Sequence, residues 1–174
     1  MTEEKFKKEL ISIVLPTYNS SKYISTTVDS VLSQDYSNWE LIITDDCSTD
    51  NTLSILNQYA KNDTRISVYK LKVNSGAAIA RNHSLKHCNS NYIAFIDSDD
   101  SWDKEKLEIQ LAFMQKNKHP ISFTSYKLVN ESGGELNRII RVKNQVNYDS
   151  YLKNTIIGMS TSMVNTNITG PIEF

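Results

Sequence analysis

The fold of this chain is indicated first by residues 92–102, which read Tyr92-Ile93-Ala94-Phe95-Ile96-Asp97-Ser98-Asp99-Asp100-Ser101-Trp102. Five apolar or aromatic residues in succession are typical of a strand that is covered on both faces, as in a parallel sheet flanked by helices. Three acidic residues then follow within four positions, at the end of the strand where such sheets bind ligands. The stretch therefore predicts a buried strand that carries carboxylates at its carboxyl end.

The acidic cluster has two interpretations. Carboxylates packed this closely repel one another, and a divalent cation beside them would remove the repulsion, so we expect Asp97 and Asp99 to bind a metal ion or a ligand. The alternative is that an acid caps the helix predicted to begin near Lys104, because Asp is favoured at that position. We expect Asp103 to be that cap. One cap needs only one acid, so capping leaves the rest of the cluster unexplained.

Strands alternate with amphipathic helices over the first two thirds of the chain. Ile24, Val28 and Val31, for example, recur at the spacing of one helical face. The pattern predicts strands at 11–15, 40–44, 65–69 and 92–96, and helices at about 22–33, 52–60, 75–87 and 104–118. Pro16 is expected to close the first strand. This alternation implies right-handed βαβ units and therefore an α/β fold, a Rossmann-like sandwich with a mostly parallel central sheet flanked by helices.

The last third of the chain has a different pattern. Strands are predicted at 121–128 and 136–142, around a hairpin signal at 132–134. One short helix is predicted at 148–154, and residues 156–164 are expected to return to the sheet. The 174 residues suit a single domain of ordinary size.

Composition excludes several classes of protein. The net charge is −1 and the basic residues are scattered, so no nucleic-acid footprint is present. Residues 1–10 lack the apolar region of a signal peptide, and no later run is long enough to span a membrane, which predicts a cytoplasmic protein. Attachment at the inner face of the membrane stays open. Two isolated cysteines, Cys47 and Cys88, and the three scattered histidines show no metal-type spacing.

Four motifs together resemble one family. They are Ser12-Ile13-Val14-Leu15-Pro16-Thr17-Tyr18-Asn19, Asp45-Asp46-Cys47-Ser48-Thr49-Asp50-Asn51-Thr52, Asn74-Ser75-Gly76 with Ala80-Arg81-Asn82, and Asp97-Ser98-Asp99-Asp100. In this order and spacing they resemble the family 2 glycosyltransferases. The resemblance implies a GT-A-type fold, with a nucleotide-binding half at 10–103 and the start of an acceptor-binding half at 104–174. It also implies inverting transfer of a sugar from a nucleotide diphosphate donor, usually a UDP-sugar, to a glycan or lipid-linked acceptor, assisted by Mn²⁺ or Mg²⁺.

The same resemblance implies the roles of individual residues. Asp99 would bind the metal, and Asp97 would lie near the ribose or complete the metal shell. Asp46 would accept a hydrogen bond from the uracil ring as an exposed loop acid, while Pro16, Thr17 and Tyr18 would flank the ring. Arg81 would meet the diphosphate or hold the acid cluster through a bidentate pair, the alternative being a solvated helix arginine.

The loop that contains Asp46 carries further expectations. A turn or cap is as plausible for Asp45 as ligand contact, and capping is favoured for Ser48 and Asp50. Cys47 replaces the glycine often found in the family, and a non-glycine residue resists a positive φ. We therefore expect the loop to depart from the family's usual backbone conformation.

A general base is missing from the expected site. Inverting transfer needs a carboxylate near the acceptor hydroxyl, and the family usually supplies it from an acidic pair in the acceptor-binding half. From Lys104 onward no such acidic pair is present, and the acids Glu131, Glu135, Asp149 and Glu173 are isolated. We therefore expect a truncated acceptor half without the base, and Glu173 keeps a minor claim. A non-catalytic nucleotide-sugar or glycan-binding module remains the main rival. A sugar nucleotidyltransferase is less favoured, because residues 16–19 contain no glycine for a phosphate loop.

Overall fold

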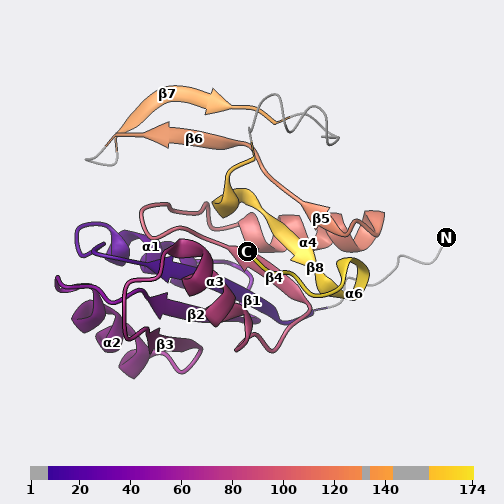
Figure 1. Cartoon of the computed structure of the whole chain (residues 1–174). Helices are drawn as coiled ribbons and strands as arrows, with labels where there is room; N and C mark the ends of the chain where they lie inside the picture. Colours follow the sequence, from indigo (N-terminus) through magenta and orange to yellow (C-terminus); the bar gives the residue numbers. More distant parts are fainter. Residues whose placement is uncertain (1–7, 131–133, 143–156) are drawn as a thin grey trace.

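The computed structural model describes residues 8–130, 134–142 and 157–174. Its elements are β1 (Ile11–Thr17), α1 (Ile24–Leu32), β2 (Trp39–Asp45), α2 (Thr52–Asn62), β3 (Ile66–Lys70), α3 (Ala77–Leu85), β4 (Tyr92–Phe95), α4 (Lys106–Asn117), β5 (Ile121–Ser122), β6 (Tyr126–Val129), β7 (Glu135–Ile140), the 3₁₀ helix η1 (Met159–Thr161), β8 (Met163–Asn165) and α6 (Thr166–Thr169). Figure 1 shows these elements as a sheet flanked by helices, with a separate hairpin above it.

The central sheet has six strands in the order β3-β2-β1-β4-β8-β5. The first four are parallel to one another, whereas β8 is antiparallel to both β4 and β5. The predicted α/β sandwich with a mostly parallel sheet is therefore confirmed. Since β1 lies between β2 and β4, the three loops that follow these strands meet at one edge of the sheet, where α/β folds bind ligands.

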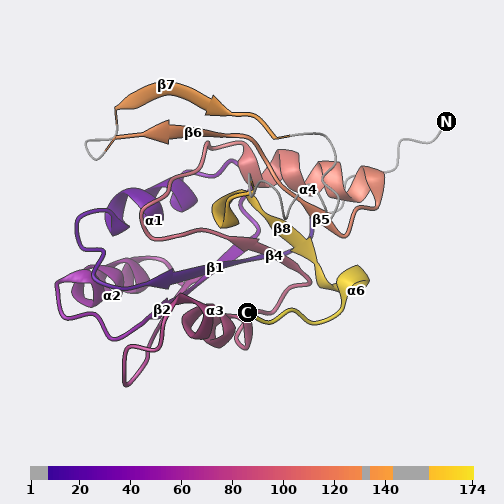
Figure 2. The ribbon, with the colours of Figure 1, turned by 45° about the horizontal axis from the view of Figure 1, so that its top comes forward.

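Helices cover both faces of the sheet. On one face, the apolar sides of α1, α2 and α4 pack on the odd-numbered residues of β1 and β2, such as Ile13 and Ile43, which are fully buried. On the other face, α3 packs beside a smaller cluster that includes Val14 and Phe95. Figure 2 shows α1 and α4 on one side of the sheet and α3 on the other. Side chains alternate across a strand, so burial on both faces explains the unbroken apolar run of β4, as the sequence indicated.

Several predicted boundaries were wrong. Pro16 does not close β1, which continues to Thr17; the pairing of β1 with β4 ends at Val14, so the missing N–H of Pro16 leaves no bond to β4 unmade. The predicted strand at 121–128 is two strands, because β5 joins the central sheet whereas β6 pairs with β7 in a separate hairpin. Of residues 156–164, only the last two belong to β8, and η1 precedes them. The predicted helix at 148–154 lies outside the described residues, as do positions 132 and 133 of the hairpin turn.

Asp103 does not cap α4. The helix begins at Lys106 with Glu105 in the cap position and has no side-chain cap. Asp103 contributes its backbone carbonyl instead, which accepts hydrogen bonds from the N–H of Lys106 and from Nε2 of Gln34. The cap prediction failed because the chain makes one more turn before the helix starts, which composition alone does not reveal.

Candidate active site

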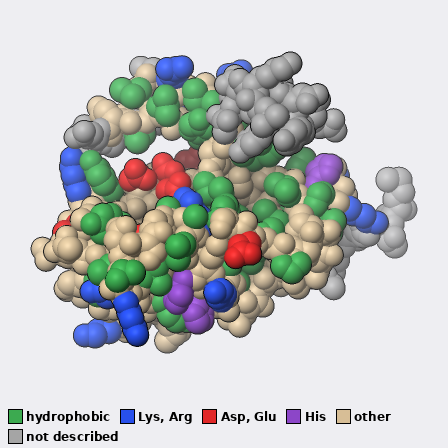
Figure 3. Space-filling view, viewed as in Figure 1, with side chains coloured by type: hydrophobic (Ala, Val, Ile, Leu, Met, Phe, Trp, Pro, Cys, Tyr) green, Lys and Arg blue, Asp and Glu red, His purple; other side chains and the backbone are tan. Residues whose placement is uncertain are grey.

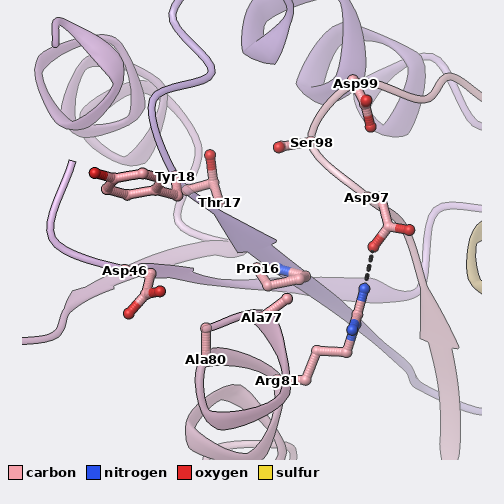
Figure 4. Close-up of a pocket in the computed structure, with 10 residues that line it drawn as sticks. All are labelled: Pro16, Thr17, Tyr18, Asp46, Ala77, Ala80, Arg81, Asp97, Ser98 and Asp99. Carbon is pink, nitrogen blue, oxygen red and sulfur yellow. Dashed lines mark hydrogen bonds and ion pairs between the residues drawn. The ribbon is translucent and has the colours of Figure 1, made fainter. Parts of the chain in front are cut away.

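A pocket of about 290 Å³ lies where β1, β2 and β4 end. It is lined by Pro16, Thr17, Tyr18, Asp46, Ala77, Ala80, Arg81, Asp97, Ser98 and Asp99. All seven residues expected to bind the nucleotide or the metal are in this set, although the segments that carry them are far apart in sequence. Figure 4 shows Asp46 and Tyr18 on one side of the pocket and Asp97 and Asp99 on the other. Figure 3 shows acidic side chains gathered in a hollow below the hairpin.

Arg81 holds the acidic loop from the α3 side. Its Nη2 atom donates to Oδ1 of Asp97 at 2.5 Å, and the two side chains are 15% and 33% exposed. Arg81 is therefore not the solvated helix arginine of the alternative interpretation. The contact uses a single nitrogen rather than a bidentate pair, and Nε is buried with no hydrogen-bond partner among the residues that the structure describes. The guanidinium keeps unused donors beside the acids, which is the arrangement that an incoming phosphate oxygen would meet.

Asp46 differs from the exposed loop acid that the sequence suggested. Its side chain is only 3% exposed, and its two oxygens accept the N–H groups of Ser75 and Gly76, each at 2.7 Å. The φ angle of Gly76 is +92°, a value that favours glycine, so this turn can present both N–H groups to one carboxylate. Asp46 thus holds the start of α3 against the end of β2. Each carboxylate oxygen can accept a second hydrogen bond, so nucleotide contact stays open.

The loops after β1 and β2 are joined by side-chain hydrogen bonds. Ser48 accepts the N–H of Asn19 rather than capping a helix, and Asn19 in turn accepts the N–H of Thr49. Asp50 does not occupy the cap position of α2, which belongs to Asn51, but its Oδ1 accepts both the N–H and the hydroxyl of Thr52, the first residue of the helix. Loss of hydration opposes its ionisation, but the hydrogen bonds outweigh this effect and lower the pKa of Asp50 to about 2. Tyr18 is held at this junction with 47% of its surface exposed.

Cys47 and Asp45 shape the turn between these loops. The φ angle of Cys47 is +64°, so this residue adopts the left-handed conformation. We had expected a cysteine here to avoid a positive φ and to change the backbone conformation of the loop. Asp45 is fully buried, and its Oδ2 accepts the N–H of Ser48, which is the turn role rather than ligand contact. The Asp45–Ser48 bond spans Cys47 and stabilises the turn. It thereby offsets the cost of the left-handed conformation, which is about 1–2 kcal/mol for a non-glycine residue.

The acidic loop is also held from two further sides. The Ser98 hydroxyl bonds to the Ser20 hydroxyl at 2.7 Å, and the Ser98 carbonyl accepts from Thr27 on α1 at 3.0 Å. On the other side, the Ser160 hydroxyl donates to Asp100. Loss of hydration raises the pKa of Asp100; the Ser160 bond opposes this rise, and the charges of Asp99 and Asp97 add to it.

Asp99 is the least constrained of the acids. It is exposed at the pocket, and within 8–130, 134–142 and 157–174 no side chain or N–H group bonds to its carboxylate. The same ranges contain no group of three or more His, Cys, Asp or Glu residues that could enclose a metal. One or two carboxylates fit a hard cation that keeps waters and binds phosphate oxygens, whereas they would not fit a metal that requires a complete protein shell.

The histidines take no part in this pocket. His87 stacks on Tyr69 with ring centroids 4.0 Å apart, and Nδ1 of His83 bonds to the Thr44 hydroxyl at 3.2 Å. Burial lowers the pKa of His83, and nearby His87 and Lys86 add to the effect. These contacts give His83 and His87 structural roles beside β2 and β3.

The comparisons with known proteins agree with the geometry. The model of the family "Glycosyl transferase family 2" matches residues 12–169. The chain belongs to glycosyltransferase family 2. TuaG of Bacillus subtilis, which its name assigns to teichuronic acid biosynthesis, is 49% identical over 95% of this chain and 66% of its own length. WfgD of Escherichia coli, named as a UDP-Glc:alpha-D-GlcNAc-diphosphoundecaprenol beta-1,3-glucosyltransferase, is 36% identical over 95% of this chain and 64% of its own.

Solved structures show the same fold. TarS of Staphylococcus aureus in complex with UDP superimposes with a TM-score of 0.66 and 37% identity, covering 69% of this chain and 36% of that one. The glycosyltransferase chain therefore has a GT-A-type fold. It spans about two thirds of the length of the two curated relatives described above. Among the helices of its described part, none combines the length and apolar character of a membrane span.

Sequence reasoning missed residues that complete the site. Ala77 and Ala80 form a wall of the pocket on α3, and their small side chains leave it open. Their helical spacing is visible in the sequence, but only the position of α3 beside β1 makes it meaningful. Ser20, Thr27 and Ser160 carried no recognisable signal, because they act through bonds to residues 60 or more positions away.

Proposed function

We propose that this family 2 chain binds a nucleoside diphosphate sugar, with UDP-sugars preferred, and transfers the sugar with inversion to a glycan or lipid-linked acceptor. The observation that carries the proposal is the convergence of the seven expected residues on one pocket, with base-binding candidates on one side and carboxylates on the other. The relatives support the substrate class, since WfgD is named for a UDP-Glc donor and a diphosphoundecaprenol acceptor, and TarS has been crystallised with UDP.

The nucleotide would be oriented by the loops after β1 and β2. Tyr18 is half-exposed and can cover a face of the base, while Asp46, already fixed by two backbone N–H groups, presents remaining acceptor capacity to a ring N–H. A base without a donor at that position would leave the carboxylate with an unpaired lone pair, which is how a buried acceptor discriminates between ligands.

The diphosphate would lie between Arg81 and the acidic loop. The residues that would hold the cation are Asp99 and Asp97, and Mn²⁺ or Mg²⁺ there would stabilise the charge that develops on the leaving nucleoside diphosphate. Arg81 would add a fixed positive charge from the opposite side, because its pair with Asp97 holds it at the pocket wall. Asp97 would thus serve two neighbours, the guanidinium and the cation or ribose.

The acceptor-binding half and the general base lie outside the donor pocket described above. We assign residues 104–174 to the start of that half. Glu173 is exposed and is not among the residues that line the pocket. Its minor claim as the base stays a prediction, and we assign the base to no other described residue. A lipid-linked acceptor would place the reaction at the inner face of a membrane, with this chain on the cytoplasmic side.

The test separates an enzyme from a binding module. UDP, GDP, UDP-glucose and UDP-N-acetylglucosamine are screened by thermal shift with Mn²⁺ or EDTA, and UDP release from the bound sugars is then followed without acceptor. We expect uridine ligands to raise Tm most, only with metal, and slow UDP release. Binding without any release would support a module, and no shift with any ligand would refute the proposal.

A further inference from the structure

Ser160 contacts the acidic loop although it does not line the pocket. It lies in η1, just before β8, and is 8% exposed. Its neighbours in the sequence come from the acceptor side of the chain, so neither motif spacing nor the nucleotide chemistry points to it. Among the described residues, its hydrogen-bond partners nevertheless all lie within 97–102.

One hydroxyl joins the two ends of the loop. The N–H of Asp97 donates to Oγ of Ser160 at 2.9 Å, and that hydroxyl donates its own proton to Oδ2 of Asp100 at 2.5 Å. The carbonyl of Ser160 also accepts Nε1–H of the buried Trp102 at 2.8 Å. Since the hydroxyl has one proton, the two bonds fix its orientation and leave only one arrangement of donor and acceptor.

The position of Ser160 is set by the core and not by the loop. Nε2 of Gln110, on α4 and 3% exposed, donates to the carbonyl of Thr161 at 3.0 Å and bonds to the Ser122 hydroxyl of β5 at 2.9 Å. The pairing of β8 with β4 anchors the following residues. The core therefore fixes the position of the Ser160 hydroxyl, and the acidic loop is held by its bonds to that hydroxyl.

Asp99 lies between the two ends that Ser160 fixes. Ser98 is bonded from the opposite side by Ser20 and Thr27, so the backbone on either side of the Asp99 carboxylate is held. Without the Ser160 hydroxyl, Asp100 would lose its donor and could turn toward Asp99, and two unpaired carboxylates so close would repel each other.

We propose that Ser160 is a positioning residue that holds the acidic loop in the conformation in which Asp99 binds the cation, and so links η1 on the acceptor side to metal-dependent donor binding. This inference rests on the proposed function. It differs from the assignment of metal ligands, because Ser160 itself touches neither the cation nor the nucleotide. Removal of the Ser160 hydroxyl should therefore reduce the increase in UDP affinity that the metal provides, and should leave the affinity for UDP without metal unchanged.

The test compares Ser160→Ala with Ser162→Ala in the 174-residue chain. Ser162 is 9% exposed, as buried as Ser160, but in the described part of the chain its hydroxyl donates only to the carbonyl of Gly158, at 3.4 Å. The Kd of UDP is measured by calorimetry in Mn²⁺ and in EDTA, and the ratio of the two gives the metal-dependent gain. Ser160→Ala should reduce this gain about tenfold, which is about 1.4 kcal/mol and typical of one charge-assisted hydrogen bond. Ser162→Ala should keep it within twofold.

Each outcome decides the proposal. If Ser160→Ala keeps the full metal-dependent gain in UDP affinity, Ser160 does not affect metal-dependent binding and the proposal is overturned. If Ser160→Ala and Ser162→Ala lose the gain equally, loosened packing explains the loss, and the proposal is also overturned. A wild-type chain whose UDP binding does not depend on Mn²⁺ would instead refute the metal-assisted part of the proposed function. If Ser160→Ala does not fold, Ser160→Cys carries the same expectation, since the thiol fills the space but is a weak donor.

Discussion

Replacing Asp46 with alanine should destabilise the protein as well as weaken nucleotide selectivity. The carboxylate is 3% exposed and accepts two backbone N–H groups at 2.7 Å each. A hydrogen bond to a charged group contributes about 1.5–3 kcal/mol, and partial entry of water into the vacated space would offset some of the loss. We therefore expect Asp46→Ala to lower the free energy of unfolding by about 3 kcal/mol.

The measurement is equilibrium urea unfolding followed by circular dichroism at neutral pH. Asp46→Asn should lose about half as much as Asp46→Ala, because the amide keeps one acceptor oxygen and turns a donor toward the other N–H. Asp103→Ala is the matched control, since Asp103 is exposed and its side chain caps no helix. That control should change the free energy of unfolding by less than about 0.5 kcal/mol.

The same variant distinguishes two explanations of selectivity. If Asp46→Ala stays within about 0.5 kcal/mol of the wild type, the carboxylate is not holding the start of α3, and the reasoning from its burial is refuted. If it is destabilised and also loses the preference for uridine over guanosine nucleotides, the two roles are combined in one side chain. A destabilised variant that keeps the preference would leave Asp46 a purely structural residue.

Three further predictions follow from single side chains. Asp99→Asn should weaken UDP binding at least tenfold in Mn²⁺ and leave it unchanged in EDTA, as calorimetry would show; equal affinity in Mn²⁺ for variant and wild type would exclude Asp99 as the ligand. Cys47→Gly should raise the free energy of unfolding by about 0.5 kcal/mol in urea, because the relief of the left-handed conformation exceeds the entropy that glycine adds to the unfolded chain; a loss of stability would contradict this. The folded pKa of Asp50, about 2, lies below its usual value, so its stabilisation is present above pH 4 and is lost as the pH falls toward 2. The stability difference between wild type and Asp50→Asn should therefore shrink over that range, and a constant difference would argue against the Thr52 bonds as its cause.

The sequence by itself determined the α/β class and seven of the residues that line the pocket. Apolar runs such as residues 92–96 and the helical face around Val28 are local patterns, and each reports its own burial on a sheet with two covered faces. The acids after β4 and the polar loops after β1 and β2 could be placed together because parallel strands bring their carboxyl ends to one edge. Those inferences need only the order of elements.

Only the tertiary structure decided which side chains hold these loops. Asp46 belongs to a polar loop segment, yet it is buried because the Ser75–Gly76 turn folds onto it from 29 positions away. Ser160 belongs to a segment that predicted only a strand, yet its hydroxyl reaches a loop 60 positions earlier. Hydrophobic periodicity reports how each segment faces the core, but a polar side chain finds its partner only after the segments pack, and that partner can be any residue which the packing brings within about 3 Å.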